Sequence, residues 1–203
     1  MKQIITKVVI GVLIATMAIL SWQVIVLRKN LREKMKVVNL MISKYEAKAQ
    51  FIDDYLPIVT EYTESEITAK RILAAVYENS AQYDIEPELI LSVIMVESEF
   101  NPKAYSSVGA IGLMQIMPVT GIYVGRSLGY SIKNENDLYN IEKNIKIGVV
   151  FLKECIDRLG EHRGLGYYYA GRHAQHYNRY TMKIAAARQF WTTDAASLTY
   201  NVH

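Results

Sequence analysis

Glu97 occupies a place in the sequence that suits a carboxyl group for acid catalysis. The eight residues before it read LILSVIMV, and with Pro87 in the first turn they predict a buried helix from Pro87 to about Glu99. A carboxyl group at the C-terminal end of such a helix meets a low dielectric and the negative end of the helix dipole, and both raise its pKa. It can then stay protonated near neutral pH and protonate a glycosidic oxygen. The alternative is that Glu97 faces solvent where its helix emerges.

No second carboxyl group stands at a spacing that makes it an obvious partner for Glu97. Ordinary glycosidases place two carboxyl groups across the bond that they cleave. Glu99 lies two positions further on, which turns its side chain by about 200° on a helix, and the next acidic residue is Glu135. A distant acid could fold back toward Glu97, so the spacing favours a single acid without excluding a second.

The stretch that begins at Glu97 resembles the lytic transglycosylase domain of the lysozyme superfamily. It reads ESEFNPKAYSSVGAIGLMQIMPVT, which carries every fixed position of the family pattern Glu-Ser-x-x-Asn-Pro and Ala-x-Ser-x-x-Gly-Ala-x-Gly-Leu-Met-Gln-x-Met-Pro-x-Thr. Further on, Asn144-Ile145-x-x-Gly148 resembles a family helix, and Tyr168-Tyr169-Ala170-Gly171 resembles its Tyr-Asn-Ala-Gly element. The resemblance covers roughly residues 70 to 180. It extends to soluble lytic transglycosylase catalytic domains and to goose-type lysozyme.

This resemblance implies substrate contacts around Glu97. Gln115 can donate to and accept from a sugar amide or hydroxyl. Met114 and Met117 offer pliable apolar surface to N-acetyl methyl groups, although core packing is an equally good interpretation of both. Ser106 resembles a cleft serine that donates to glycan oxygens, and Tyr168 resembles the family tyrosine near the catalytic acid. Tyr169 replaces the usual Asn of the cleft wall.

The loop between these positions contains Gly109 and Gly112, which permit a tight turn and a close approach of the backbone to a sugar.

The resemblance also implies the reaction. Glu97 would protonate the glycosidic oxygen between N-acetylmuramic acid and N-acetylglucosamine, the substrate's own N-acetyl group would stabilise the oxocarbenium ion, and Glu97 would then deprotonate the C6 hydroxyl to close a 1,6-anhydro ring. One alternative is a muramidase on the same fold, which would use water and give a reducing end. Another is an inactive peptidoglycan-binding scaffold of an envelope-spanning machine, which activity on purified cell walls would test.

Composition and charge narrow the classes of ligand and cofactor that the protein could bind. The net charge of +3 suits an anionic polymer or a membrane surface, and no basic cluster interleaved with aromatic residues predicts nucleic-acid binding. The single cysteine, Cys155, lies in an apolar helical pattern typical of a buried residue. His173 and His176 stand three residues apart, but no third ligand lies beside them. We therefore expect no metal and no cofactor.

Residues 8–27 read VVIGVLIATMAILSWQVIVL, an uncharged run long enough to cross a bilayer as a helix. A cleaved signal peptide would have a shorter apolar region that ends in small residues, so we predict an uncleaved transmembrane anchor. Residues 1–7 would lie in the cytoplasm and the catalytic domain outside the inner membrane, on the periplasmic side. The basic residues that follow the span, with Arg28, Lys29 and Arg32 among them, favour the opposite orientation. We predict the periplasmic orientation nevertheless, because the implied substrate lies outside the inner membrane.

Residues 28–63 are predicted to form a helical stalk, because apolar residues recur there every three or four positions. They are Leu31, Met35, Val38, Ile42 and Tyr45. The stalk could pair with a second copy, pack on the domain or contact an envelope machine, but it is too short and irregular for a coiled-coil prediction.

Residues 64–185 are predicted to form an all-α, lysozyme-like domain, with residues 186–203 as a C-terminal tail. Ser65 is a candidate N-cap for a helix up to Tyr83, and further helical patterns run from 139 to 159 and from about 176 to 191. The residues expected to face inward in the first of these helices are Ile67, Ile72, Leu73, Val76 and Tyr77.

Overall fold

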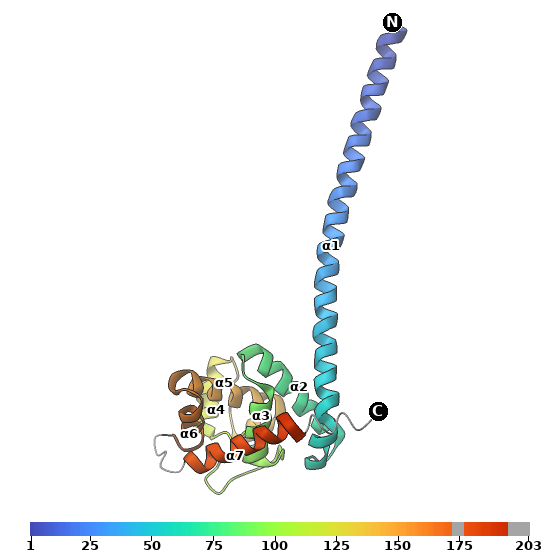
Figure 1. Cartoon of the computed structure of the whole chain (residues 1–203). Helices are drawn as coiled ribbons and strands as arrows, with labels where there is room; N and C mark the ends of the chain where they lie inside the picture. Colours follow the sequence, from blue (N-terminus) through green and yellow to red (C-terminus); the bar gives the residue numbers. More distant parts are fainter. Residues whose placement is uncertain (172–176, 195–203) are drawn as a thin grey trace. The chain divides into compact units, whose positions relative to one another are not determined.

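The computed structural model describes residues 1–171 and 177–194, and all regular elements in these two ranges are helical (Figure 1). The helices are α1 (Lys2–Tyr62), α2 (Glu66–Tyr83), α3 (Pro87–Ser98), α4 (Pro118–Ser127), η1 (Glu135–Tyr139), α5 (Ile141–Leu159), α6 (Glu161–Ala170), α7 (Tyr177–Gln189) and η3 (Phe190–Asp194). The prediction of an all-α fold is confirmed. The pairing of extended residues in this part of the chain is limited to isolated bridges of Ile111 with Tyr105 and Ile116.

The chain divides into two units, Met1–Ala47 and Lys48–His203. The first unit is a single stretch of α1 whose large apolar side chains are exposed, including the predicted stalk residues from Leu31 to Tyr45. An 18-residue window of α1 reaches a mean hydropathy of 2.3, so this helix is long and apolar enough to cross a membrane.

The second unit begins sixteen positions earlier than the predicted boundary at residue 64, because the last turns of α1 join its core. Ile58 and Val59 are buried, and Phe51 stacks at a tilt on Tyr77 of α2 with ring centroids 5.5 Å apart. The predicted stalk is therefore two stretches of one helix with different surroundings, exposed up to Ala47 and increasingly buried beyond it.

Helix α2 begins as predicted at Ser65, whose Oγ accepts a hydrogen bond from the backbone N–H of Thr68 at 3.2 Å. Ile72, Leu73 and Val76 are fully buried, as the helical period predicts. Ile67 was expected to face inward as well, but it is 73% exposed, because it lies two positions before the fully buried Ala69 and therefore points to the opposite side of α2.

Helix α3 is the central helix of the domain, and it carries Glu97 in its last turn (Figure 1). It starts at Pro87, as predicted, and every residue from Leu89 to Ile94 is buried. It packs against α2 and α7, while α5 packs against α2 and α6. Because α3 is buried on all sides, its position in the domain is fixed, and with it the position of Glu97 at its end.

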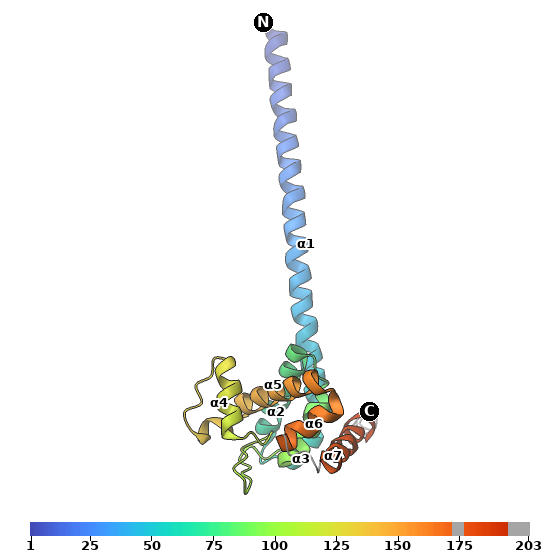
Figure 2. The same ribbon diagram turned by 90° about the vertical axis from the view of Figure 1, so that its left-hand side faces the viewer.

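Three short elements, α4, η1 and α6, carry no clear apolar period and were not predicted. In α6, Gly164 and Gly166 allow the backbone to approach its neighbours, since a Cβ would lie 2.7 Å from Ile156 Cα or from Tyr177 Cβ respectively. Figure 2 shows α4 on the opposite side of the domain from α7, with α5 and α2 between them.

The folded domain extends beyond residue 185, where the predicted tail begins. Ala187 is buried on α7, and Trp191 of η3 is buried with an edge-on contact to Phe100 at 5.8 Å between ring centroids. Tyr55 of α1 contacts the same indole at 5.8 Å. The domain includes these residues because the side chain of Trp191 packs on Tyr55 and Phe100, which come from distant parts of the chain.

Candidate active site

Glu97 lies where α3 ends and the chain turns sharply. Glu99 caps the helix in the left-handed conformation with φ 50°, and Phe100 follows with φ 61°. The Oγ of Ser98 donates to the carbonyl of Leu113 at 2.8 Å, which ties the helix end to the following loop. Glu99 is exposed, whereas Glu97 is only partly accessible. The two neighbouring carboxylates therefore have different surroundings, as their spacing predicts.

Burial raises the pKa of Glu97 to about 7, and two neighbours oppose this rise. The hydroxyl of Tyr180 donates to Glu97 Oε1 at 2.7 Å, and the positive charge of Lys183 also favours the ionised carboxylate. The direction predicted from the sequence is confirmed. Near neutral pH, a sizeable fraction of Glu97 carries a proton that it can donate, and its conjugate base has a hydrogen-bond donor in place.

The loop after α3 is held from within by Asn144 of α5. This buried side chain accepts from the backbone N–H of Met114 at 2.8 Å and donates to the carbonyls of Ile111 at 2.9 Å and Leu138 at 2.8 Å. Gly112 has φ 74°, and a Cβ on it would lie 2.5 Å from Asn144 Nδ2. The glycine is required both by its conformation and by its contact with the amide.

Ser106 and Gln115 make hydrogen bonds within the same loop. Ser106 Oγ accepts from the backbone N–H of Ala110 at 2.8 Å, and Gly109 completes this turn with φ 86°. The Nε2 of Gln115 donates to the carbonyl of Gly112 at 2.9 Å. Both side chains are partly accessible, and both contribute to the shape of the loop in the absence of ligand.

Met114 lies in the core, so the prediction that its side chain contacts substrate is wrong. Its side chain is fully buried against Gly148 of α5, where an added Cβ would lie 2.7 Å from Met114 Cβ. The missing side chain of the glycine provides the space for the methionine. Met117, by contrast, is 39% exposed immediately before α4.

Tyr168 joins the same loop from α6. Its hydroxyl donates to the carbonyl of Met114 at 2.7 Å, and burial raises its pKa well above the usual value. The charge of Glu97 contributes to that rise, so the tyrosine lies within electrostatic range of the acid. Its hydrogen bond nevertheless goes to the loop, and the tyrosine that donates to Glu97 is Tyr180.

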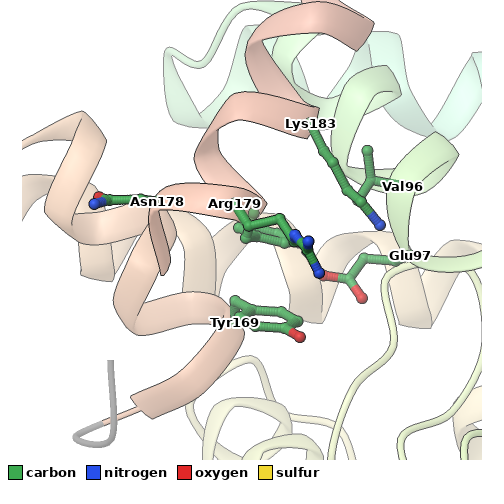
Figure 3. Close-up of a pocket in the computed structure, with 7 residues that line it drawn as sticks. Val96, Glu97, Tyr169, Asn178, Arg179 and Lys183 are labelled. Atoms are coloured by element: carbon green, nitrogen blue, oxygen red, sulfur yellow. Dashed lines mark hydrogen bonds between the residues drawn. The ribbon is translucent and has the colours of Figure 1, made fainter. Parts of the chain in front are cut away.

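A cavity of about 490 Å³ opens beside Glu97 (Figure 3). Its lining consists of Val96, Glu97, Tyr169, Asn178, Arg179, Tyr180 and Lys183. Of the predicted site residues in the described part of the chain, it brings together Glu97 and Tyr169, whereas the loop residues Ser106, Gln115 and Met117 are not part of this lining.

Tyr169 forms part of the cavity wall by stacking on Tyr180. Their rings are 4.5 Å apart and inclined by 14°, and Tyr169 remains 54% exposed. The residue that departs from the family pattern thus packs on the tyrosine that donates to Glu97. Figure 3 shows Arg179 and Lys183 extending from α7 toward Glu97, while Asn178 points away from it.

The α7 residues of the cavity were missed by the sequence analysis. Arg179, Tyr180 and Lys183 fall on one face of the helix predicted near 176–191, at spacings of one, three and four residues. The helical period could have grouped them, but nothing in their types indicates that this face packs on the end of α3.

The described residues contain no group of three or more His, Cys, Asp or Glu side chains able to hold a metal ion. His173 and His176 lie outside the described residues. Cys155 is buried, as expected, and burial raises the pKa of its thiol to about 11.

Comparison with known proteins identifies relatives of the domain. The family described as "Transglycosylase SLT domain" matches residues 74–189. The transglycosylase of Enterobacteria phage PRD1 is 42% identical over 82 residues, which are 40% of this chain and 28% of that protein. Membrane-bound lytic murein transglycosylase C of Glaesserella parasuis serovar 5 (strain SH0165) is 39% identical over 100 residues, which are 48% of this chain and 27% of that protein. The matched segments thus span little more than a quarter of these relatives.

Among solved structures, the 70-kDa soluble lytic transglycosylase of Escherichia coli is 21% identical, with a TM-score of 0.47. The match covers 69% of this chain and 25% of that protein. Lytic transglycosylase Slt of Pseudomonas aeruginosa is 24% identical, with a TM-score of 0.46, over 58% of this chain and 21% of the other.

Proposed function

Because the chain belongs to the transglycosylase SLT domain family, we propose that it is a membrane-anchored lytic transglycosylase of peptidoglycan. It cleaves the β-1,4 bond between N-acetylmuramic acid and N-acetylglucosamine. The observation that carries this proposal is one partly buried carboxyl group, Glu97, with a pKa of about 7 at the wall of a ligand-sized cavity.

In the first step, Glu97 donates its proton to the glycosidic oxygen, and the bond from that oxygen to C1 of the muramyl residue breaks. The carbonyl oxygen of the substrate's N-acetyl group shares the positive charge that develops on C1. Glu97 is then a carboxylate, and the donor hydroxyl of Tyr180 at 2.7 Å stabilises it. Proton donation and the stabilisation of its product therefore use the same pair of side chains.

In the second step, Glu97 removes the proton from the C6 hydroxyl of the same sugar, and the C6 oxygen bonds to C1. The products are a 1,6-anhydromuramyl end and a free 4-hydroxyl on the leaving glycan, and Glu97 is protonated again. The pKa of about 7 suits both roles, because neither the acid nor the base form is strongly disfavoured near neutral pH.

The cavity favours substrate assistance over a two-carboxylate mechanism. Among the cavity-lining residues that the structure describes, Glu97 is the only one with an acidic side chain. Glu99 is exposed at the helix cap. A water-using muramidase remains the competing reaction on the same residues, and the product distinguishes the two.

The loop after α3 and the α6 wall supply the proposed substrate contacts. Ser106, Gln115 and Met117 lie along the loop at partly accessible or exposed positions, where a glycan strand that extends beyond the cavity can contact them. Tyr169 offers an exposed ring face to the strand. Tyr168 supports the loop at the carbonyl of Met114.

We propose that residues 8–27 anchor the protein in the cytoplasmic membrane, with residues 1–7 inside the cell. The apolar window in α1 supports an anchor. The catalytic domain is then on the periplasmic side, where peptidoglycan lies. Fusion of a reporter that is active on only one side of the membrane to the C-terminus tests this orientation directly.

The reaction is tested by digesting purified peptidoglycan with the full-length chain in detergent and identifying the products by mass spectrometry. We expect muropeptides with 1,6-anhydro ends, which are lighter by one water than hydrolysis products. Reducing ends alone would establish a muramidase. Binding without any soluble product would favour the scaffold alternative.

A further inference from the structure

The α7 wall of the cavity carries two cations that the chemistry of Glu97 does not use. Arg179 and Lys183 lie four residues apart on this helix, line the cavity and extend toward Glu97 (Figure 3). Within residues 1–171 and 177–193, neither side chain forms a salt bridge with an acidic group within 4.0 Å. Arg188, about two and a half turns beyond Arg179 on the same helix, is paired with both Glu86 and Glu161.

These cations oppose the state in which Glu97 begins the reaction. A positive charge near a carboxyl group favours its ionised form, and Lys183 lowers the pKa of Glu97 against the effect of burial. When Glu97 is protonated, the described lining of the cavity has two positive side chains and no negative one. An anionic group that entered the cavity would be attracted to this wall and would offset its effect on the acid.

The proposed substrate carries such a group on the sugar whose C1 is attacked. Each muramyl residue bears a lactyl substituent, which ends in a carboxylate or continues as a peptide that itself carries carboxylates. Guanidinium and ammonium groups bind carboxylates through charge-assisted hydrogen bonds. Neutral polymers of N-acetylglucosamine share the β-1,4 linkage and the N-acetyl groups but carry no carboxylate.

We propose that Arg179 and Lys183 bind a carboxylate of the muramyl substituent and thereby select anionic peptidoglycan strands over neutral N-acetylglucosamine polymers. The inference rests on the proposed function, since it assigns the substrate group that the α7 wall recognises. The contact places the muramyl ring, whose C1 is attacked, on the side of the cavity that faces Glu97.

The test measures glycan binding by the full-length chain in detergent, with Glu97→Gln in every variant so that the ligand is not consumed. Arg179→Gln and Lys183→Gln are compared with Arg163→Gln, which removes an exposed charge of α6 outside the cavity lining. The ligands are soluble peptidoglycan strands with peptides, the same strands after amidase treatment, and neutral chito-oligosaccharides.

We expect each cavity substitution to weaken binding of one anionic ligand about fivefold, the effect of about 1 kcal/mol for an accessible ion pair. Loss confined to strands with peptides identifies a peptide carboxylate, and loss confined to amidase-treated strands identifies the lactyl carboxylate. Affinity for chito-oligosaccharides and the behaviour of Arg163→Gln should not change. The preference of the Glu97→Gln protein with Arg179 and Lys183 intact should also weaken as salt rises, because ions screen the attraction.

Unchanged affinity for both anionic ligands, or an equal loss for the neutral ligand, would overturn the proposal. The proposed function fails separately, through the absence of anhydro products from digests by the wild-type chain. The binding measurement does not depend on cleavage. It therefore tests the role of Arg179 and Lys183 independently of the products found in the digest.

Discussion

Two regions next to Glu97, a first wall that lies outside the cavity lining and a second wall that belongs to it, are built by different means. On one side, the loop after α3 is fixed by backbone hydrogen bonds to the buried amide of Asn144 and by glycines that no other residue could replace without strain. On the other side, α6 and α7 contribute side chains that remain accessible, Tyr169 and Arg179 among them. The first wall determines where the acid stands, and the second determines what charge and aromatic surface it meets. Substitutions should therefore affect stability on one side and affinity or pH dependence on the other.

Glu97→Gln should have the largest effect, because Glu97 is the proposed acid of the first step and the proposed base of the second. Loss of a general acid or base costs roughly 10²–10⁴-fold, and here one group serves both steps, so the rate of anhydromuropeptide release should fall to the top of that range or beyond it. Glu99→Gln is the matched control, since Glu99 is exposed at the helix cap. Substantial release by folded Glu97→Gln protein would remove Glu97 from its role.

The same substitution should stabilise the fold at alkaline pH. The folded-state pKa of about 7 lies above the value of 4.5 for a free glutamate, so the native state holds the proton more tightly and loses stability as pH rises through this interval. Gln carries no such penalty. Relative to wild type, thermal or urea melts should show a gain of about 1 to 3 kcal/mol at pH 8 and a smaller gain at pH 5.

Asn144→Ala should break the first wall. It leaves one N–H and two carbonyls without their buried partner, at about 1–3 kcal/mol for each unsatisfied group, so the free energy of unfolding should fall by about 3 kcal/mol or more. Asn140→Ala is a sharp comparison, because Asn140 caps the same helix at an exposed position and its loss should cost only about 1 kcal/mol. Equal losses in urea titrations would contradict the distinction between a buried clamp and a cap.

Tyr180→Phe should act on the second wall with little change in stability. The hydrogen bond from Tyr180 lowers the pKa of Glu97, so its removal should raise that pKa above the wild-type value of about 7. The fall in activity on the alkaline side should then move to higher pH, while the maximal rate falls because the carboxylate formed in the first step loses its donor. Tyr177→Phe, outside the cavity lining, should leave the pH profile of anhydromuropeptide release unchanged.

Tyr169→Asn should preserve or raise activity, because it restores the residue usual at this family position. The stacking on Tyr180 would be lost, and that contact is worth about 0.5–1.5 kcal/mol. Steady-state release of anhydromuropeptides measures the outcome. A large decrease in a protein with an unchanged melting temperature would instead identify the exposed face of Tyr169 as a specific substrate contact.

Removal of residues 1–27 should have the smallest effect on catalysis. All cavity residues lie beyond position 95, and the compact unit starts at Lys48. The shortened protein should be soluble without detergent and should digest peptidoglycan at a rate close to that of the full chain. An inactive but folded product would mean that the anchor does more than tether the domain.

The first wall was largely predictable from the sequence, whereas the second was not. The apolar run before Glu97 and the glycines of the loop each depend on local rules, and the structure bears them out. The N-cap of α2 at Ser65, outside this wall, was predicted by a local rule in the same way. The sequence could not distinguish substrate contact from core packing for Met114. Its burial depends on the space left by Gly148, which lies thirty-four positions away in the chain. No local pattern reveals such a contact.

Tyr180 and Trp191 were missed for a related reason. Each acts through partners far along the chain, the carboxylate of Glu97 for Tyr180 and the rings of Tyr55 and Phe100 for Trp191. The sequence predicted a helix near residues 176–191 but did not indicate which of its faces packs on another helix. The residues that complete the site are therefore those whose roles depend on the packing of helices rather than on their neighbours in the sequence.

The position of α7 after every other wall of the cavity has a consequence for how the enzyme is made. A chain is synthesised and exported from its N-terminus, so α3 and its loop emerge well before the helix that carries Tyr180 and Lys183. Until α7 docks on α3, Glu97 lacks its hydrogen-bond donor and the cavity lacks a side. If the proposed function holds, an unfinished chain should therefore be unable to cleave peptidoglycan, and cleavage should begin only when the late helix is in place.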